Sequence, residues 1–521
     1  MTSRPPGTAD ATNRLVQRAY TLAGRNAFLG TASAAYGALL VILRGRPSVG
    51  VDAGVFLSVA GRLVHGDHLY RDVWDNKDPL FFYADAAALW VGGWTGPFLL
   101  DILWVALAAA SVVLLLRKLT APPIAAAAGF VVYPLLLTGQ WYYAGYSMLA
   151  ALALAPFAAW LWARGTAAAS GVVVALGMLF KINLALVLLA APVALLAMGI
   201  PARRDARGAL RFLGGLGATL AAVVAALAAR GELVPYFHML RDNVSYANDV
   251  LVANGRLGGI HGHIRVVETA TRHAHLVIGV FLAVAAVAVW AVIRRRRPGG
   301  SGPLGVVAAL FLVVGGATAV TLALTTAWNH HVQMLAYPGV LLVLFVVAAL
   351  GAAARSSPLR LGAQLAAAVG AVVLLGAASP AAAGGSESAW VHGAHSQTAA
   401  ALEVVRAKRF PAAATVSYAH LGQNDEEAHA AFLGGGWALA CARFHQYPWT
   451  PGATLSGIVR CIEKRRPDLL LVTSSLSDRA GVPSTWHEFV VTAQELVRRE
   501  YERVYFLRHA HGTVAVWQLR A

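Results

Sequence analysis

Residues 51–83 read VDAGVFLSVAGRLVHGDHLYRDVWDNKDPLFFY and form the most polar stretch in the first two-fifths of an otherwise apolar chain. Its charged side chains include Asp52, Arg62, Asp67, Asp72, Asp75, Lys77 and Asp78. A helix that faces lipid does not tolerate such a density of charge. The stretch is therefore expected to lie in water, or in a cavity at a membrane surface, and the apolar remainder of the chain is expected to hold it there.

The composition around this stretch is that of a membrane protein. The chain has 521 residues, 58% of them hydrophobic and 13% charged, whereas a soluble protein has a charged fraction of about 25%. Apolar runs of roughly 17–22 residues recur along it, which is typical of membrane-spanning helices. The net charge of +17 comes from Arg clusters between these runs, where it sets topology. No basic face on a soluble domain is apparent, so a nucleic-acid partner is not expected.

The predicted fold class is an all-α polytopic membrane protein. A basic tail, residues 1–26, is predicted to be cytoplasmic, and about eleven spans follow. They cover about residues 27–43, 97–116, 121–137, 146–162, 167–181, 184–200, 210–229, 274–293, 304–326, 332–350 and 361–378.

Residues 79–94 decide the topology, because they are apolar enough to span but contain Asp85. If they lie flat at the interface, every basic cluster between the spans falls on the cytoplasmic side. If they span, every cluster falls outside. The positive-inside rule favours the flat helix. The clusters are Arg117/Lys118, Arg164, Arg203/Arg204/Arg207/Arg211, Arg294–Arg297 and Arg355/Arg360.

This topology divides the chain into a membrane domain, residues 27–378, and an extracytoplasmic domain, residues 379–521. The membrane domain has a first outer loop at 44–96 and a long outer loop at 230–273. In the second domain, strands are predicted at 415–419, 468–474 and 513–519, and amphipathic helices at 399–408 and 489–498. This alternation predicts a small α/β fold. Cys441 and Cys461 lie outside, where they form either a disulfide or two buried thiols.

Common catalytic motifs are missing from the sequence. There is no Walker A sequence, no GxGxxG after a strand, no HExxH and no GxSxG. The outer face also offers no nucleotides. An enzyme that works there needs an activated donor from the membrane itself, and a lipid-linked phosphate is the natural form.

The opening stretch resembles the first outer loop of the GT-C glycosyltransferases. The shared pattern is an Asp just after the first span, a helix, a G-x-x-Y turn, and D-x-W-D-N-K-D-P-L before a flat helix. By pattern it is most similar to the protein O-mannosyltransferases and the aminoarabinose transferases that modify lipid A. Residues 328–338, WNHHVQMLAYP, resemble a second pattern of the family. The resemblance covers residues 27–378 and implies a polyprenyl-phosphate sugar donor and transfer at the outer membrane surface.

The resemblance also implies roles for single residues. Asp52 occupies the place of the family's general base on the acceptor hydroxyl. The second acid of the family is replaced by Ala53, which leaves Asp75 or Asp78 to supply it. Lys77 matches the basic residue that contacts the donor phosphate. Further candidates for the phosphate are Arg62, Lys181, His330 and His331.

Each of these residues also has a structural interpretation. Asp75, Lys77 and Asp78 could form a solvated loop with local ion pairs, and His330 and His331 could lie in a wet loop. Asp52 could cap a helix that begins near Ala53, and Asp78 is favoured as the cap of the flat helix that Pro79 starts. Arg62 and Lys181 could be anchors at the membrane interface. No metal site is predicted, because two adjacent His side chains rarely converge on one ion. The sequence identifies no cofactor, and dependence on a divalent cation stays open.

The sequence therefore predicts an inverting membrane glycosyltransferase of a bacterial plasma membrane. Its predicted partners are a polyprenyl-phosphate monosaccharide, membrane lipids, and a glycan, lipid or protein acceptor. Mannose and arabinose are the candidate sugars. The alternatives are a ligase or polymerase of lipid-linked oligosaccharides, a transporter or flippase, and a scaffold that binds glycan. The spans are nearly free of charge, which argues against the transporter.

Overall fold

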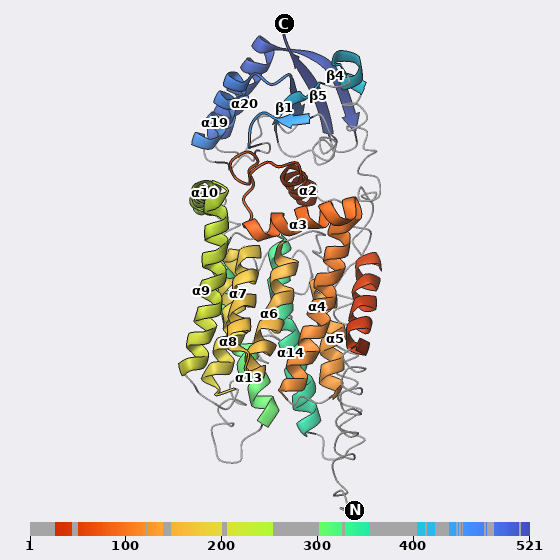
Figure 1. Cartoon of the computed structure of the whole chain (residues 1–521), viewed down its shortest axis with the longest axis vertical. Helices are drawn as coiled ribbons and strands as arrows, with labels where there is room; N and C mark the ends of the chain where they lie inside the picture. The colour runs from red at the N-terminus through yellow and green to blue at the C-terminus, as the bar shows by residue number, and fades with distance from the viewer. Residues whose placement is uncertain are drawn as a thin grey trace, which may run out of the picture.

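The computed structural model describes most of the predicted spans and the core of the C-terminal domain. The described residues are 27–43, 51–119, 123–138, 147–200, 206–253, 302–325, 329–353, 404–411, 414–422, 437–443, 446, 450, 452–473, 476, 484–509 and 512–521. Figure 1 shows an upright bundle of helices with a small α/β domain above one end. We call that end of the bundle the head end.

The upright helices agree with the predicted spans to within a few residues. They are the helix Ala27–Leu43, α4 (Gly96–Lys118), α5 (Pro123–Leu137), α6 (Ser147–Arg164), α7 (Ala167–Phe180), α8 (Ala185–Ala197), α9 (Ala206–Ala229), α13 (Gly302–Leu324) and α14 (Ala336–Ala353). The predicted spans at 274–293 and 361–378 lie outside the described residues. Among those described, α4, α6, α9 and the Gly305–Leu324 part of α13 are long and apolar enough to cross a membrane. The chain is thus a helical membrane protein.

Small residues allow a close helix contact between α7 and α9. A Cβ atom at Gly171 would lie 2.1 Å from the carbonyl oxygen of Phe212, and one at Gly215 would lie 2.1 Å from that of Ala168. Two glycines that face the opposite backbone let the helices approach closely, as small residues do in membrane bundles. This contact fixes α9, which leads back to the head end.

Residues 79–94, predicted to form a flat helix, contain α3 (Pro79–Gly92), which runs across the ends of the upright helices (Figure 1). It packs on α2 (Val51–Val64), where the Phe56 ring lies 5.0 Å from Phe81 and 6.1 Å from Phe82. A short 3-10 turn, Gly93–Thr95, then starts α4 at the head end.

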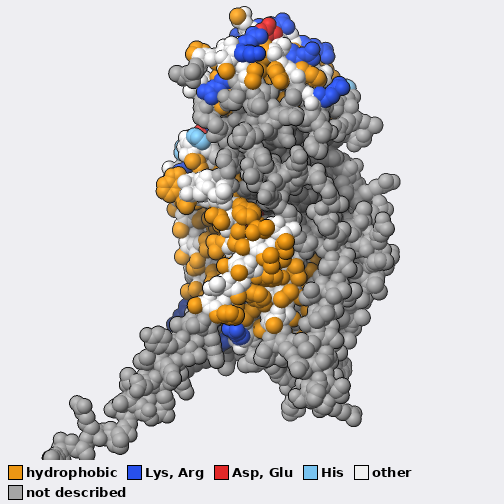
Figure 2. All heavy atoms as spheres, turned by 90° about the vertical axis from the view of Figure 1, so that its right-hand side faces the viewer, with side chains coloured by type: hydrophobic (Ala, Val, Ile, Leu, Met, Phe, Trp, Pro, Cys, Tyr) orange, Lys and Arg blue, Asp and Glu red, His pale blue; other side chains and the backbone are white. Residues whose placement is uncertain are grey.

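The described basic residues between the spans lie at the end opposite the head. They are Arg117 and Lys118 at the end of α4, Arg164 at the end of α6, and Arg207 and Arg211 at the start of α9. Figure 2 shows hydrophobic side chains over the middle of one face, with Lys and Arg below them and the charged surface of the domain above. The described basic residues between the spans and the C-terminal domain therefore lie at opposite ends of the bundle (Figure 1).

The predicted outer loop at 230–273 contains a helix that was not expected from the sequence. Residues of this segment form α10 (Leu233–Ala253), which lies across the end of α9 (Figure 1). The helix was not predicted from the sequence, because its apolar residues are interrupted by polar ones: His238, Arg241, Asp242 and Asn243. Residues 254–273 lie outside the described part of the chain.

The C-terminal domain contains a five-stranded sheet with the strand order β2-β1-β3-β5-β4. The strands β1, β2 and β3 are parallel, whereas β5 is antiparallel to both of its neighbours. The strands are β1 (Val416–Leu421), β2 (Trp437–Leu439), β3 (Leu469–Thr473), β4 (Tyr501–His509) and β5 (Gly512–Leu519). The helices α19 (Gly452–Arg465) and α20 (Ser484–Glu500) pack on one side of the sheet (Figure 1).

The three predicted strands and the predicted helix at 489–498 are confirmed as β1, β3, β5 and α20. The predicted helix at 399–408 is described only from residue 404, where it is helical to 409. The prediction missed β2, β4 and α19. Strand β4 carries Glu502, Arg503 and Arg508 and pairs only with β5 at the sheet edge, so it lacks the apolar run of a central strand.

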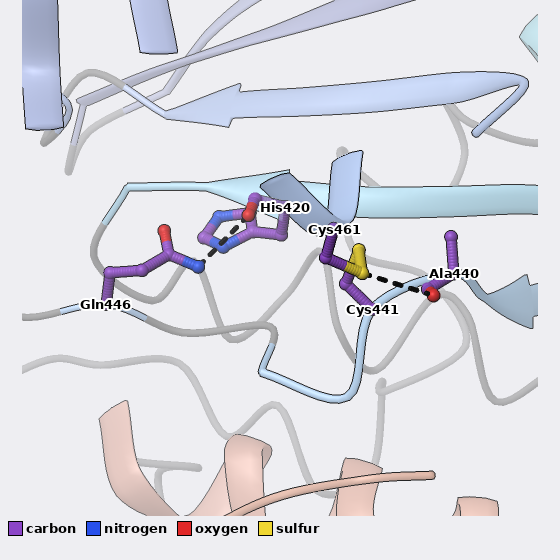
Figure 3. The surroundings of a disulfide bond; sticks show 5 residues. All are labelled: His420, Ala440, Cys441, Gln446 and Cys461. Carbon is purple, nitrogen blue, oxygen red and sulfur yellow. Dashed lines mark hydrogen bonds between the residues drawn. A yellow bond between two sulfur atoms is a disulfide. The ribbon is translucent and has the colours of Figure 1, made fainter. Parts of the chain in front are cut away.

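The two cysteines form a disulfide, which settles the alternatives that the sequence left open. Cys441 follows β2, Cys461 lies in α19, and their Cα atoms are 6.0 Å apart. Figure 3 shows the bridge beside Gln446, whose Nε2 donates to the carbonyl of His420 at 3.1 Å. The bridge ties residues 437–443 to the helix layer of the domain.

The same residues dock the domain on the head end of the bundle. The backbone N–H of Trp74 donates to the carbonyl of Ala442 at 2.8 Å. The guanidinium of Arg443 lies 3.9 Å from the centre of the Trp74 ring and pairs with Asp242 of α10 at 2.5 Å. The domain thus contacts both the opening stretch and α10.

Candidate active site

Asp52 lies in the first turn of α2, and the structure describes its backbone only. Position 52 is one helical turn, about 6 Å along the axis, before Phe56 and shares a helix face with it. The Nζ of Lys77 lies 5.1 Å from the centre of the Phe56 ring. The Nζ of Lys77 therefore lies beside the face of α2 to which position 52 belongs.

Tyr70 shapes the loop between α2 and α3. Its φ angle of +62° is unusual for a residue with a side chain. Its N–H donates to the carbonyl of Val73 at 2.6 Å and its hydroxyl to the carbonyl of Lys77 at 2.7 Å. The ring is buried 5.4 Å from that of Tyr236. A strained residue held on every side is a common feature of functional loops.

Asp75 is buried within this loop, and its carboxylate accepts the backbone N–H of Lys77 at 3.1 Å. Burial raises the pKa of Asp75, while the nearby charges of Lys77 and Lys181 oppose that rise. The two predicted site residues Asp75 and Lys77 are thus brought together with Lys181, which lies 104 positions away from Lys77 in the sequence.

Asp78 is also buried, but it does not cap α3 with its side chain, so that part of its interpretation is wrong. Its carboxylate accepts the backbone N–H of Ile182 at 2.8 Å and the hydroxyl of Tyr236 at 3.1 Å. Burial raises the pKa of Asp78 to about 6, against the effect of these two hydrogen bonds and of Lys181 and Lys77. The side chain instead joins α3 to η2 and α10.

Lys181 is buried where the chain breaks between α7 and η2 (Ile182–Leu184). Its backbone is extended, with φ −158° and ψ 96°, which ends α7. From the sequence, Lys181 was predicted to be a phosphate ligand that follows a span. In the structure, its charge also acts on the carboxyl groups of Asp75 and Asp78. Buried carboxyl groups with raised pKa values and specific charged neighbours favour a functional site.

The remaining phosphate candidates lie elsewhere on the head end. Arg62, in the last turn of α2, donates to Asp67 at 2.5 Å and to the carbonyl of Trp437 at 2.9 Å. His331 is buried in η3 (Asn329–Leu335), which packs against α13 and α14. For His330 the structure describes the backbone only. Arg62 thus has one partner in the C-terminal domain, Trp437, and its contact with a donor stays a prediction.

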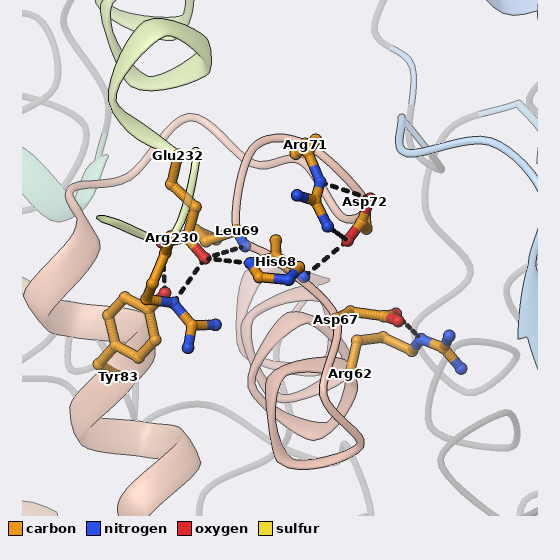
Figure 4. A network of polar contacts seen from close by, with 9 residues as sticks. All are labelled: Arg62, Asp67, His68, Leu69, Arg71, Asp72, Tyr83, Arg230 and Glu232. Carbon is orange, nitrogen blue, oxygen red and sulfur yellow. Dashed lines mark hydrogen bonds and ion pairs between the residues drawn. The ribbon is translucent and has the colours of Figure 1, made fainter. Parts of the chain in front are cut away.

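The sequence did not reveal Glu232, which is fully buried at the turn between α9 and α10. One oxygen accepts the backbone N–H of Leu69 at 3.1 Å and the Nε of Arg230 at 2.9 Å, and lies 3.4 Å from Nδ1 of His68. The other accepts the hydroxyl of Tyr83 at 2.5 Å. Figure 4 shows these partners converging from the loop, α3 and the α9–α10 turn. No pattern in the neighbouring sequence indicates that Glu232 is buried.

Two more carboxyl groups of the head end are buried, those of Asp85 in α3 and Asp101 in the second turn of α4. Asp101 qualifies the expectation that the spans are nearly free of charge, although it lies close to the end of its helix. Among the described residues, no group of three or more His, Cys, Asp and Glu side chains could hold a metal ion.

Comparison with known proteins gave one solved structure of note. No family model matches the chain, and no curated protein matches it. The chain is similar to the arabinofuranosyltransferase AftD from Mycobacteria, solved by single-particle cryo-EM, with 15% sequence identity and a TM-score of 0.47. The likeness covers 94% of this chain and 40% of AftD, so the chain spans about two-fifths of the length of that protein.

Proposed function

We propose that this protein is a membrane glycosyltransferase of the GT-C type that acts at the head end. It transfers one sugar from a polyprenyl-phosphate donor to an acceptor on the extracytoplasmic side, with inversion at the anomeric carbon. The donor comes from the lipid leaflet, and the acceptor is a cell-wall glycan, a lipid or a protein. The head end would face outward, with the N-terminus cytoplasmic.

In the proposed step, Asp52 takes the proton of the acceptor hydroxyl. The acceptor oxygen forms a bond to the anomeric carbon, and the bond from that carbon to the phosphate oxygen breaks. The electron pair of the broken bond stays on the leaving polyprenyl phosphate. Lys77, supported by Lys181, offsets the negative charge that grows there.

The observation that carries this proposal is the arrangement around residues 75–78. Asp75 and Lys77 lie next to each other, and Lys181 reaches them from another helix pair. Burial of Asp75 holds its proton more tightly than water does, so it can act as a second acid or base. The site lies at the head end, level with α3, where a lipid-linked phosphate would be presented.

Asp52→Asn tests the base. We expect transfer to fall by about 10²–10⁴-fold, the usual contribution of a general base, while binding of the donor persists. The protein in nanodiscs would be given decaprenyl-phosphate arabinose, decaprenyl-phosphate mannose or a lipid-linked oligosaccharide. Release of polyprenyl phosphate is then measured with a cell-wall glycan as acceptor.

The matched control is Asp72→Asn, since Asp72 lies in the same stretch and pairs with the exposed Arg71 at 2.8 Å. It should keep full activity. Full activity in Asp52→Asn would rule out the proposed base. Turnover of the oligosaccharide alone would favour a ligase or polymerase.

A further inference from the structure

The helix α10 has one face that nothing described in the structure covers. Val234, Phe237 and Val244 are 65%, 57% and 63% exposed. With the exposed Arg241, their spacing of three, four and three residues puts them on one stripe of the helix. Three large apolar side chains in a stripe are rarely left in water. The stripe therefore needs an apolar neighbour.

The opposite face of α10 holds the candidate site. Tyr236 donates its hydroxyl to Asp78 at 3.1 Å, and the Nδ2 of Asn243 donates to the carbonyl of Asn76 at 2.9 Å. Met239 is buried between them along the same face. The exposed stripe cannot turn toward the bundle, because these contacts fix the rotation of the helix about its axis.

The position of α10 indicates what covers the stripe. The preceding helix, α9, is the least covered of the four candidate spans, and Leu210, Leu213 and Val224 are exposed along it. Such an apolar helix surface in a membrane bundle faces lipid. A sharp turn at Gly231, φ +70°, then sends α10 across the end of α9 (Figure 1). The stripe thus belongs to a helix that directly follows the exposed apolar side chains of α9, at the level where the bundle ends.

We propose that α10 is a membrane-surface helix whose Val234, Phe237 and Val244 stripe lies in the outer leaflet. Its apolar side chains reach the border of headgroups and acyl chains, as in other interfacial amphipathic helices. Arg241 extends from the same stripe to the lipid phosphates. Through Tyr236 and Asn243, the lipid surface then sets the height of residues 76–78.

Spin labelling tests the location of the stripe without any assay of activity. The chain has two cysteines, and both are in the disulfide, so an added cysteine carries the only label. Val234→Cys, Phe237→Cys and Val244→Cys would be labelled in the full chain. The protein is then placed in vesicles of phosphatidylethanolamine and phosphatidylglycerol. Val491→Cys is the control, because Val491 is an apolar residue of α20 that is 42% exposed on the C-terminal domain.

We expect the ratio of relaxation by oxygen to relaxation by a water-soluble nickel chelate to be several-fold higher at the three α10 sites than at Val491. A ratio equal to that at Val491 would overturn the proposal, because it places the stripe in water. Low relaxation by both reagents would also overturn it, since protein would then cover the stripe. Neither result depends on whether the protein transfers a sugar.

Discussion

The carboxyl groups of Asp78 and Glu232 are both buried at the head end, yet their surroundings differ. Glu232 has an ion pair with Arg230 at 2.9 Å and hydrogen bonds from Leu69 and Tyr83. Asp78 has two neutral donors, Ile182 and Tyr236, and two lysine charges that act from a distance. The charge of Glu232 is therefore balanced by a cation in direct contact, whereas the charge of Asp78 is not.

This difference gives the two carboxyl groups different expected properties. A buried carboxylate with a paired cation and several donors stabilises the elements that it joins, here the loop, α3 and the α9–α10 turn. A buried carboxyl group without a direct cation has a raised pKa, and Asp78 reaches about 6. Such a group can change its protonation near neutral pH.

The largest effect is expected from Glu232→Ala. Loss of the carboxylate leaves the buried Leu69 N–H and the partly buried Tyr83 hydroxyl without an acceptor, and Arg230 without its partner. We expect the free energy of unfolding to fall by about 3–5 kcal/mol, measured by thermal unfolding in detergent.

The matched control for Glu232→Ala is Glu463→Gln. Glu463 pairs with Arg499 at 3.4 Å on the exposed surface of the C-terminal domain, where an ion pair contributes at most about 1 kcal/mol. Equal losses of unfolding free energy in the two variants would show that the buried contacts of Glu232 do not stabilise the protein more than an exposed ion pair does.

The next effect is a change in pH dependence in Asp78→Asn. Because the folded protein raises the pKa of Asp78 from its ordinary 3.8 to about 6, it favours the neutral form. That stabilisation is complete below about pH 4 and is lost as the pH rises through 6. The wild type should therefore lose about 3 kcal/mol relative to the variant between pH 4 and pH 7.

Thermal unfolding of both proteins at several pH values checks this result. Asn can still accept the Ile182 N–H, so the variant is expected to fold. A difference between the two proteins that does not change with pH would mean that Asp78 has no raised pKa.

The smallest effect should distinguish the two tyrosines that donate to these carboxylates. Tyr236→Phe removes a donor to the ionised form of Asp78, which raises its pKa further, by about one unit. Tyr83→Phe removes a donor to Glu232 instead and should leave the pH midpoint of Asp78 unchanged. The same pH series of unfolding experiments measures both, and equal shifts would contradict the separation of the two sites.

The site could be predicted in part from the sequence. Asp75, Lys77 and Asp78 were found because they stand close together in an apolar chain, which is a local property. Lys181 was found only as a charge after a span. Glu232 and Tyr236 were missed, because each looks like an ordinary residue of a polar segment. Their importance comes from burial against elements about 150 residues away.

By itself, the sequence determined the membrane class, the described upright helices, the flat helix α3 and the central strands of the C-terminal domain. Run length, hydropathy and the positions of Arg and Lys suffice for these, since each depends on neighbouring residues. Only the tertiary structure decided the helix α10, the Cys441–Cys461 disulfide and the contrast between Asp78 and Glu232. The protonation and pairing of a carboxyl group depend on what packs around it, and distant segments supply that packing.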